Sequence, residues 1–142
     1  MEYRKLTHST YYCNYHVVFI PKYRRKVLYG NIKQHLGAVF HNLACQKECK
    51  IEEGHLMPDH VHMLISIPPK HPVSNVIGFM KGKSAIYIAR NLLNRQKNFT
   101  GQSFWARGYF VSTVGLNEET IRDYIKNQDK DDRNQDELGL FK

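Results

Sequence analysis

The chain has 142 residues, a length typical of one domain, and 42% of them are hydrophobic, so it can bury a core. Lys and Arg outnumber Asp and Glu by 21 to 13, and the formal net charge of +8 favours a polyanionic partner such as nucleic acid. No apolar run approaches the roughly 18 residues of a membrane span, and the N-terminus has no apolar signal core. The three cysteines have no framework spacing, which argues against a disulfide-rich secreted protein and favours the cytoplasm.

The first third of the chain predicts a strand, a basic turn and a helix. Residues 11–20 are rich in aromatic and β-branched residues, which predicts a strand that ends at Pro21. The basic cluster KYRRK follows at 22–26. Apolar residues at helical spacing then predict a helix over 31–49.

The middle of the chain predicts a hairpin and a long helix. Residues 50–57 and 60–68 have the pattern of two strands joined by a tight turn at Pro58-Asp59. Residues 73–97 repeat apolar positions at helical spacing.

The last third predicts a fourth strand over 104–114 and a terminal helix that begins near Asn117. We expect the charged end, 129–142, to be a mobile tail. The order β, α, β, β, α, β, α predicts an α+β fold of one domain. It would be a ferredoxin-like sandwich, with an antiparallel sheet, two crossover helices on one face, and the C-terminal helix as an addition.

His60 and His62 lie one residue apart inside an apolar strand. Alternate residues of a strand point to the same face, so the two imidazoles project together. They can bind one metal ion, or they can be ordinary strand histidines with hydrogen-bond partners, and the strand alone leaves both interpretations open. The opposite face carries residues suited to a helix-covered core: Val61, Met63, Ile65 and Ile67.

A metal site needs more ligands than two histidines, and Asp59 would point to the opposite face if the strand included it. The predicted terminal helix offers Tyr124 and Gln128, which share one helical face with Ile121 and Ile125. A helix docked on the open face of the sheet would bring Tyr124 and Gln128 to the histidines. An amphipathic helix whose tyrosine only packs would explain the same spacing.

Several segments resemble the single-tyrosine HUH transposases, the TnpA proteins of small bacterial and archaeal insertion sequences. MPDHVHMLIS resembles the His-hydrophobic-His motif of that family, and IRDYIKNQ resembles its nucleophile helix. NYHVVFIPKYRRKVL is similar to the first strand and basic turn, FMKGKSAIYIAR to the long helix, and FWARGYFVSTVG to the last strand. The resemblance therefore covers most of the chain.

The resemblance implies one HUH transposase domain over 1–142 and a prokaryotic, nucleoid-associated location. It implies that Tyr124 is the nucleophile and that His60, His62 and Gln128 bind a divalent metal, Mg²⁺ or Mn²⁺. The implied reaction cuts and rejoins single-stranded DNA at insertion-element ends through a 5′-phosphotyrosine intermediate. DNA hairpins would be the recognition signals, and the protein would act as a homodimer with active sites completed in cis or in trans.

Two alternatives to a transposase stay open. A rolling-circle replication initiator or relaxase would share the metal and the tyrosine, although this short chain has no attached helicase or primase region. A non-catalytic, basic DNA-binding module would keep the histidines in a structural role.

Basic residues with aromatic neighbours suit phosphate contacts and base stacking, although a solvated basic surface has the same composition. We expect the cluster after the first strand, the long helix and the last strand to supply the DNA contacts. The candidates are Lys22, Tyr23, Arg24, Arg25, Lys81, Lys83, Arg90 and Arg107.

A second constellation could bind zinc. His41, Cys45 and Cys49 follow each other at intervals of four residues on the predicted helix, hence on one face, but no fourth ligand is evident. We interpret them as ordinary packing or edge residues. We assign no catalytic role to the other histidines, although His55 is near enough to the turn to support the pair.

Overall fold

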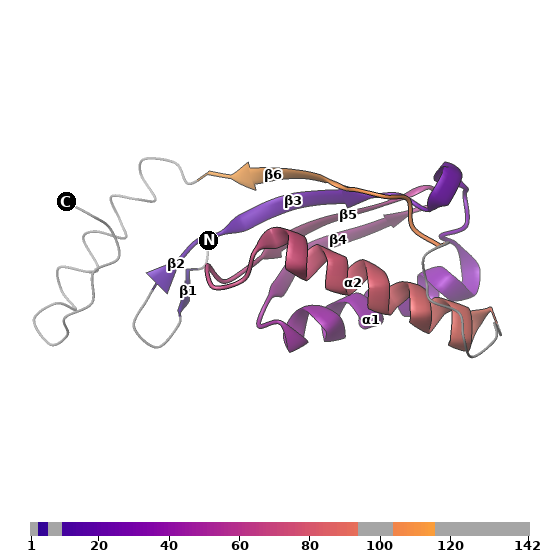
Figure 1. The fold of residues 1–142 in the computed structure, drawn as a ribbon, viewed down its shortest axis with the longest axis horizontal. Coiled ribbons are helices and arrows are strands. Elements are labelled where there is room, and N and C mark those ends of the chain that lie inside the picture. The colour runs from indigo at the N-terminus through magenta and orange to yellow at the C-terminus, as the bar shows by residue number, and fades with distance from the viewer. Residues whose placement is uncertain (1–2, 6–9, 94–103, 116–142) are drawn as a thin grey trace, which may run out of the picture.

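A four-stranded antiparallel sheet is the central layer of the protein (Figure 1). The computed structural model describes residues 3–5, 10–93 and 104–115. The sheet has the spatial order β4-β5-β3-β6, and α1 and α2 both lie on one of its faces. This arrangement confirms the predicted ferredoxin-like α+β sandwich. Its elements are β3 (Asn14–Phe19), α1 (Gly30–Gln46), β4 (Lys50–Met57), β5 (His60–Ser66), α2 (Val73–Tyr87) and β6 (Phe110–Val114).

The segment before the sheet differs from the prediction. Tyr11 belongs to a separate two-stranded ribbon, formed by β1 (Arg4–Lys5) and β2 (Thr10–Tyr11), and the first strand of the sheet begins only at Asn14. The terminal helix from Asn117, with Tyr124 and Gln128, and the tail 129–142 lie outside the described residues.

The hairpin of β4 and β5 has the predicted turn at Pro58-Asp59, and it places the core side of β5 against the helices. Val61 and Met63 lie opposite Phe19 and Val17 of β3, and their side chains are almost fully buried. Burial of each such side chain stabilises the fold by about 1.5–3 kcal/mol. A shift of one residue in the register would turn these side chains to the other face, so the core fixes the register of β5.

Helix α1 ends at Gln46, three residues before the predicted boundary. Glu48 has a φ of 59°, in the left-handed region, and this conformation ends the helix and redirects the chain into β4. Cys49 therefore does not continue the helical face of His41 and Cys45. It is buried, whereas His41 and Cys45 are exposed, which agrees with their interpretation as packing and edge residues.

Helix α2 starts at Val73 as predicted but gives way to one turn of π-helix, η2 (Ile88–Leu92). The rest of the predicted helix, from residue 94 to 97, lies outside the described residues. No helix in the described ranges is long and apolar enough to span a bilayer.

The last strand is shorter than predicted, because Phe104 and Trp105 belong to the core rather than to the strand. The ring of Trp105 packs edge-on against Phe19, with centroids 4.8 Å apart, and its indole N–H donates to Ser84 Oγ at 3.0 Å. The backbone of Trp105 also forms an isolated bridge with Pro21. The chain is therefore anchored in the core before β6 begins at Phe110.

The burial of Cys49 predicts unequal thiol reactivity. Burial raises the pKa of the Cys49 thiol to about 11, whereas Cys45 is exposed. With a pKa of about 11 in place of 9.0, the thiolate fraction at pH 8 falls roughly 100-fold, so iodoacetamide should modify Cys49 much more slowly than an ordinary exposed thiol. Mass spectrometry of tryptic peptides separates the two sites at Lys47, and Cys45 should be modified first.

The control is the same labelling in guanidinium chloride, where both cysteines should react at similar rates. Equal rates in the folded protein would contradict the burial of Cys49.

Candidate active site

Helices α1 and α2 cover one face of the sheet (Figure 1), and the buried Val61 and Met63 of β5 belong to that face. The alternation of β5 therefore places His60 and His62 on the opposite face, as predicted. Across the sheet, His60 faces Met57 of β4, and His62 lies between His55 of β4 and Val18 of β3. Both imidazoles are half-buried. The pair is thus held by the central strand and remains accessible from the open face.

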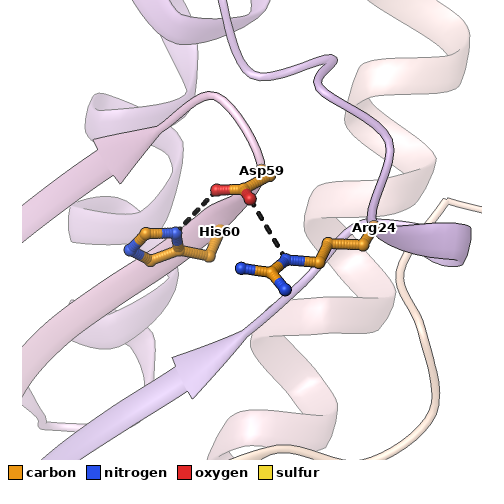
Figure 2. A network of polar contacts seen from close by, with 3 residues as sticks. All are labelled: Arg24, Asp59 and His60. Carbon is orange, nitrogen blue, oxygen red and sulfur yellow. Dashed lines mark hydrogen bonds and ion pairs between the residues drawn. The ribbon is translucent and has the colours of Figure 1, made fainter.

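Asp59 orients the first of the two imidazoles. Strand β5 starts at His60, so Asp59 belongs to the turn and does not point to the opposite face. The N–H at Nδ1 of His60 donates to Oδ1 of Asp59 at 2.8 Å (Figure 2). With the proton at Nδ1, the lone pair of Nε2 is left for a ligand, which is the tautomer that a metal-binding histidine needs.

Arg24 holds the other oxygen of the same carboxylate. Its Nε–H donates to Oδ2 of Asp59 at 3.1 Å (Figure 2). The hydrogen bond from His60 and the positive charge of Arg24 lower the pKa of Asp59 below its ordinary value. The carboxylate is therefore ionised at neutral pH and accepts both hydrogen bonds.

The turn that carries Arg24 has an unusual backbone. Within η1 (Lys22–Arg24), Tyr23 and Arg24 have φ values of 62° and 52°, in the left-handed region that residues with a side chain rarely adopt. The backbone N–H of Lys22 donates to the carbonyl of Phe104, and that of Leu28 donates to the carbonyl of Pro58 in the β4–β5 turn. The basic turn is thus fixed on both sides, next to the turn that carries Asp59.

Two further histidines flank His62. The sequence analysis assigned neither a catalytic role and named only His55 as near enough to support the pair. His16 of β3 places Nδ1 3.2 Å from Nε2 of His62, and the ring centroid of His55 lies 6.0 Å from that of His62. Burial, and then the neighbouring imidazoles of His16, His55 and His60, lower the pKa of His62. A metal ligated through Nε2 of His62 requires the contact with His16 to open, whereas one ligated through Nδ1 leaves it intact.

The signal for His16 was present in the sequence. His16 alternates with the core residues Val17 and Phe19, which places it on the open face of β3. The cross-strand register that brings it to His62 is not readable from one strand.

The donor set suits a divalent metal but is incomplete in the described part of the chain. His60 offers a free Nε2, and the lowered pKa of His62 keeps its ring neutral at pH 7, so both can act as nitrogen ligands. Within residues 3–5, 10–93 and 104–115, no three His, Cys, Asp or Glu side chains are arranged to hold an ion. A third protein ligand, such as the predicted Gln128, would have to come from outside the described residues. Gln128 and the predicted nucleophile Tyr124 lie outside the described residues.

The predicted DNA contacts divide into two groups. Lys22, Tyr23, Arg24 and Arg25 form the basic turn beside the histidines, and the ring of Tyr23 is 83% exposed. The second group lies on α2, η2 and the segment before β6, where three of the candidate DNA contacts are exposed: Lys83, Arg90 and Arg107.

Lys81 makes structural contacts within the protein. Its ammonium donates to the carbonyls of Ala106 and Gly108, both at 2.7 Å, and burial lowers its pKa. These bonds tie α2 to the segment before β6 and leave one of the three N–H groups of Lys81 for a DNA phosphate.

Comparison with known proteins shows which family the chain belongs to. The family model described as "Transposase IS200 like" matches residues 9–128, which is most of the chain. The chain belongs to the IS200-like transposase family. It is 39% identical over 137 residues to the transposase of insertion sequence element IS200 from Salmonella typhimurium, covering 96% of this chain and 90% of that protein.

One further relative and two solved structures are also similar to the chain. The ISDra2 transposase TnpA of Deinococcus radiodurans is 30% identical over 131 residues, covering 90% of this chain and 92% of that protein. A crystal structure of a transposase from the same organism matches with a TM-score of 0.65 and 27% identity, over 90% of this chain and 98% of the other. A tyrosine transposase bound to a REP hairpin shares the fold, with a TM-score of 0.55 and 17% identity over 92% of this chain and 74% of that one.

The two lysines of α2 give a matched pair of variants. Lys81→Met leaves the carbonyls of Ala106 and Gly108 without their charged donor, so it should lower the free energy of unfolding by about 2 kcal/mol. Lys83→Met changes an exposed side chain and should stay within about 0.5 kcal/mol of the parent protein. Urea denaturation followed by circular dichroism measures both, and equal stability of the two variants would contradict the structural role of Lys81.

Proposed function

We propose that this IS200-like transposase cuts and rejoins single-stranded DNA at the ends of an insertion element, with Tyr124 as the nucleophile. The observation that carries the proposal is the placement of His60 and His62 side by side on the open face of the sheet, with one ring nitrogen of His60 held by Asp59. In the proposed site, His60, His62 and Gln128 hold one divalent metal, Mg²⁺ or Mn²⁺.

The metal would act as a Lewis acid on an anionic phosphodiester oxygen, because three neutral ligands leave it nearly its full charge. The hydroxyl of Tyr124 loses its proton and attacks the scissile phosphorus. A bond forms between the phenolic oxygen and phosphorus, and the bond from phosphorus to the 3′ oxygen breaks. That oxygen takes up a proton and leaves as a 3′-OH, while the 5′ end stays on the enzyme.

The phosphotyrosine intermediate distinguishes this reaction from hydrolysis. It preserves a phosphodiester, so a 3′-OH from another DNA end can attack the phosphorus and release the tyrosine. Cutting and rejoining then need no outside energy source. The net result is a strand transfer between two DNA ends.

The basic turn supports single-stranded DNA as the substrate. Exposed Arg24 and Arg25 offer charge to the phosphates, and the exposed ring of Tyr23 offers a surface for base stacking. The tyrosine transposase that shares this fold is bound to a REP hairpin, so we include a DNA hairpin at each element end as the recognition signal.

The covalent step predicts a DNA adduct that depends on Tyr124. Single-stranded oligonucleotides from both strands of the DNA flanking the gene, chosen to contain a hairpin, are incubated with the protein and Mn²⁺. A denaturing gel should show a protein–DNA adduct that chelator abolishes and that Tyr124→Phe lacks. Tyr29→Phe removes the hydroxyl of an exposed tyrosine that is not one of the proposed catalytic, metal-binding or DNA-binding residues, and it should leave the adduct at the parental level.

An adduct formed by Tyr124→Phe would show that another residue is the nucleophile. If the parent protein forms no adduct with any of these oligonucleotides but still binds them, the chain is a DNA-binding module rather than an enzyme.

A homodimer joined through the sheet is part of the proposal, and β6 is the edge that suits it. The two edge strands of the sheet are β4 and β6. The β4 edge carries exposed charged residues such as Glu52 and Glu53, which oppose strand pairing. The β6 edge has no charged residue, and the side chains of Phe110 and Val111 are 62% and 39% exposed. An apolar, uncharged edge strand favours pairing with a second copy.

A charge on the β6 edge should therefore weaken the dimer. We expect Val111→Lys to shift the protein toward a monomer in sedimentation-velocity ultracentrifugation at micromolar concentration. The control Glu52→Lys places the same side chain on the β4 edge and should leave the dimer intact. A dimer that persists in Val111→Lys, with circular dichroism showing an unchanged fold, would place the interface on another surface.

A further inference from the structure

We propose that Arg24 is a positioning residue for the metal ligand His60, and that it acts through the carboxylate of Asp59. The proposal rests on the proposed function in one respect, namely that His60 binds the metal. Three residues form the chain of contacts: the guanidinium of Arg24 donates to Oδ2 of Asp59, and Oδ1 of Asp59 accepts from His60 (Figure 2).

Asp59 by itself would not hold its carboxylate in one orientation. It lies in a turn between two strands, and a carboxylate held by one hydrogen bond can rotate about its side-chain torsions. The contact with Arg24 fixes the second oxygen, so the first oxygen stays aimed at Nδ1 of His60. His60 is thereby kept in the tautomer and ring orientation that leave Nε2 for the metal.

The position of Arg24 is itself well determined. Its backbone adopts a φ of 52°, and its N–H donates to the carbonyl of Pro21 at 2.8 Å. Further along, the N–H of the fully buried Leu28 donates to the carbonyl of Pro58, the residue before Asp59. The turn with Arg24 and the turn with Asp59 are thus joined by a backbone bond as well as by the side chains.

The contact between Arg24 and Asp59 contributes little to stability, which points to a role in orientation. The side chain of Arg24 is 70% exposed and that of Asp59 is 22% exposed, and exposed ion pairs contribute little to stability. The terminal nitrogens of Arg24 have no hydrogen-bond partner within the part of the chain that the structure describes. They remain available for a DNA phosphate while Nε holds Asp59.

Arg25 supplies a matched control. It is the adjacent arginine and is also exposed, but its Nε donates only to the main-chain carbonyl of Lys22, at 3.3 Å. Arg24→Gln and Arg25→Gln each remove one positive charge near the site. Loss of a positive charge by itself strengthens the binding of a cation. If Arg24→Gln binds the cation more weakly and Arg25→Gln does not, the weaker binding therefore cannot be a charge effect.

The first experiment measures Mn²⁺ binding to the full chain without DNA, by electron paramagnetic resonance of the free ion. Mutation of the groups that hydrogen-bond to metal-binding histidines typically lowers metal affinity by about 10–100-fold. We therefore expect Arg24→Gln to weaken Mn²⁺ binding about tenfold and Arg25→Gln to leave it unchanged or slightly stronger. The double variant Arg24→Gln/Asp59→Ala should bind like Asp59→Ala alone, because both residues act by the same route.

The second experiment tests the orientation without metal or DNA. Long-range ¹H–¹⁵N NMR correlations report which ring nitrogen of His60 carries the proton. The parent protein and Arg25→Gln should show the Nδ1–H form, and Arg24→Gln should show an increased share of the Nε2–H form.

The outcomes separate the two proposals. His60→Ala serves as the reference: if it does not weaken Mn²⁺ binding, His60 is not a ligand, and the metal site and this inference both fail. If His60→Ala weakens binding while Arg24→Gln behaves like Arg25→Gln in both experiments, the metal site stands and the positioning role of Arg24 is wrong. Additive losses in the double variant would likewise overturn a route through Asp59.

Discussion

The register of β5 is the constraint on which the candidate active site depends. This strand lies inside the sheet, paired with β4 and β3, and it buries Val61 and Met63 against the helices. Because side chains alternate along a strand, the apolar residues that fill the core also fix His60 and His62 on the open face. The positions of the proposed metal ligands are thus set by the hydrophobic core, and they need no bound metal to define them.

The basic turn is fixed by the core in a different way. Left-handed backbone at Tyr23 and Arg24 costs about 1–3 kcal/mol for each residue, so neighbouring structure must hold it in place. The hydrogen bond from Lys22 to Phe104 and the bridge between Pro21 and Trp105 join the turn to a buried aromatic cluster. The strain at the turn is therefore offset by packing on the other side of the sheet. This is how two exposed arginines come to have defined positions beside the histidines.

The alternation and the turn chemistry of the sequence predicted the topology, the β4–β5 hairpin and the face that carries the histidine pair. The errors come from interactions that one segment does not contain. The predicted last strand began too early, because Trp105 packs in the core against Phe19 and β6 begins only at Phe110. The approach of His16 to His62, and of Arg24 to Asp59, depends on strand order and on the path of a turn. Local periodicity predicts which face a residue occupies, but pairing between distant segments decides which residues meet on that face.

The charges around the histidine pair are balanced in a way that suits a phosphodiester substrate. The carboxylate of Asp59 is ionised and would repel DNA, but the guanidinium of Arg24 lies against it and offsets that charge. The lowered pKa of His62 keeps this imidazole neutral at pH 7. A divalent ion held by neutral ligands would keep nearly its full charge and would bind weakly on that account. An anionic phosphate would supply the negative charge that the neutral ligands lack, so metal and DNA should each strengthen the binding of the other.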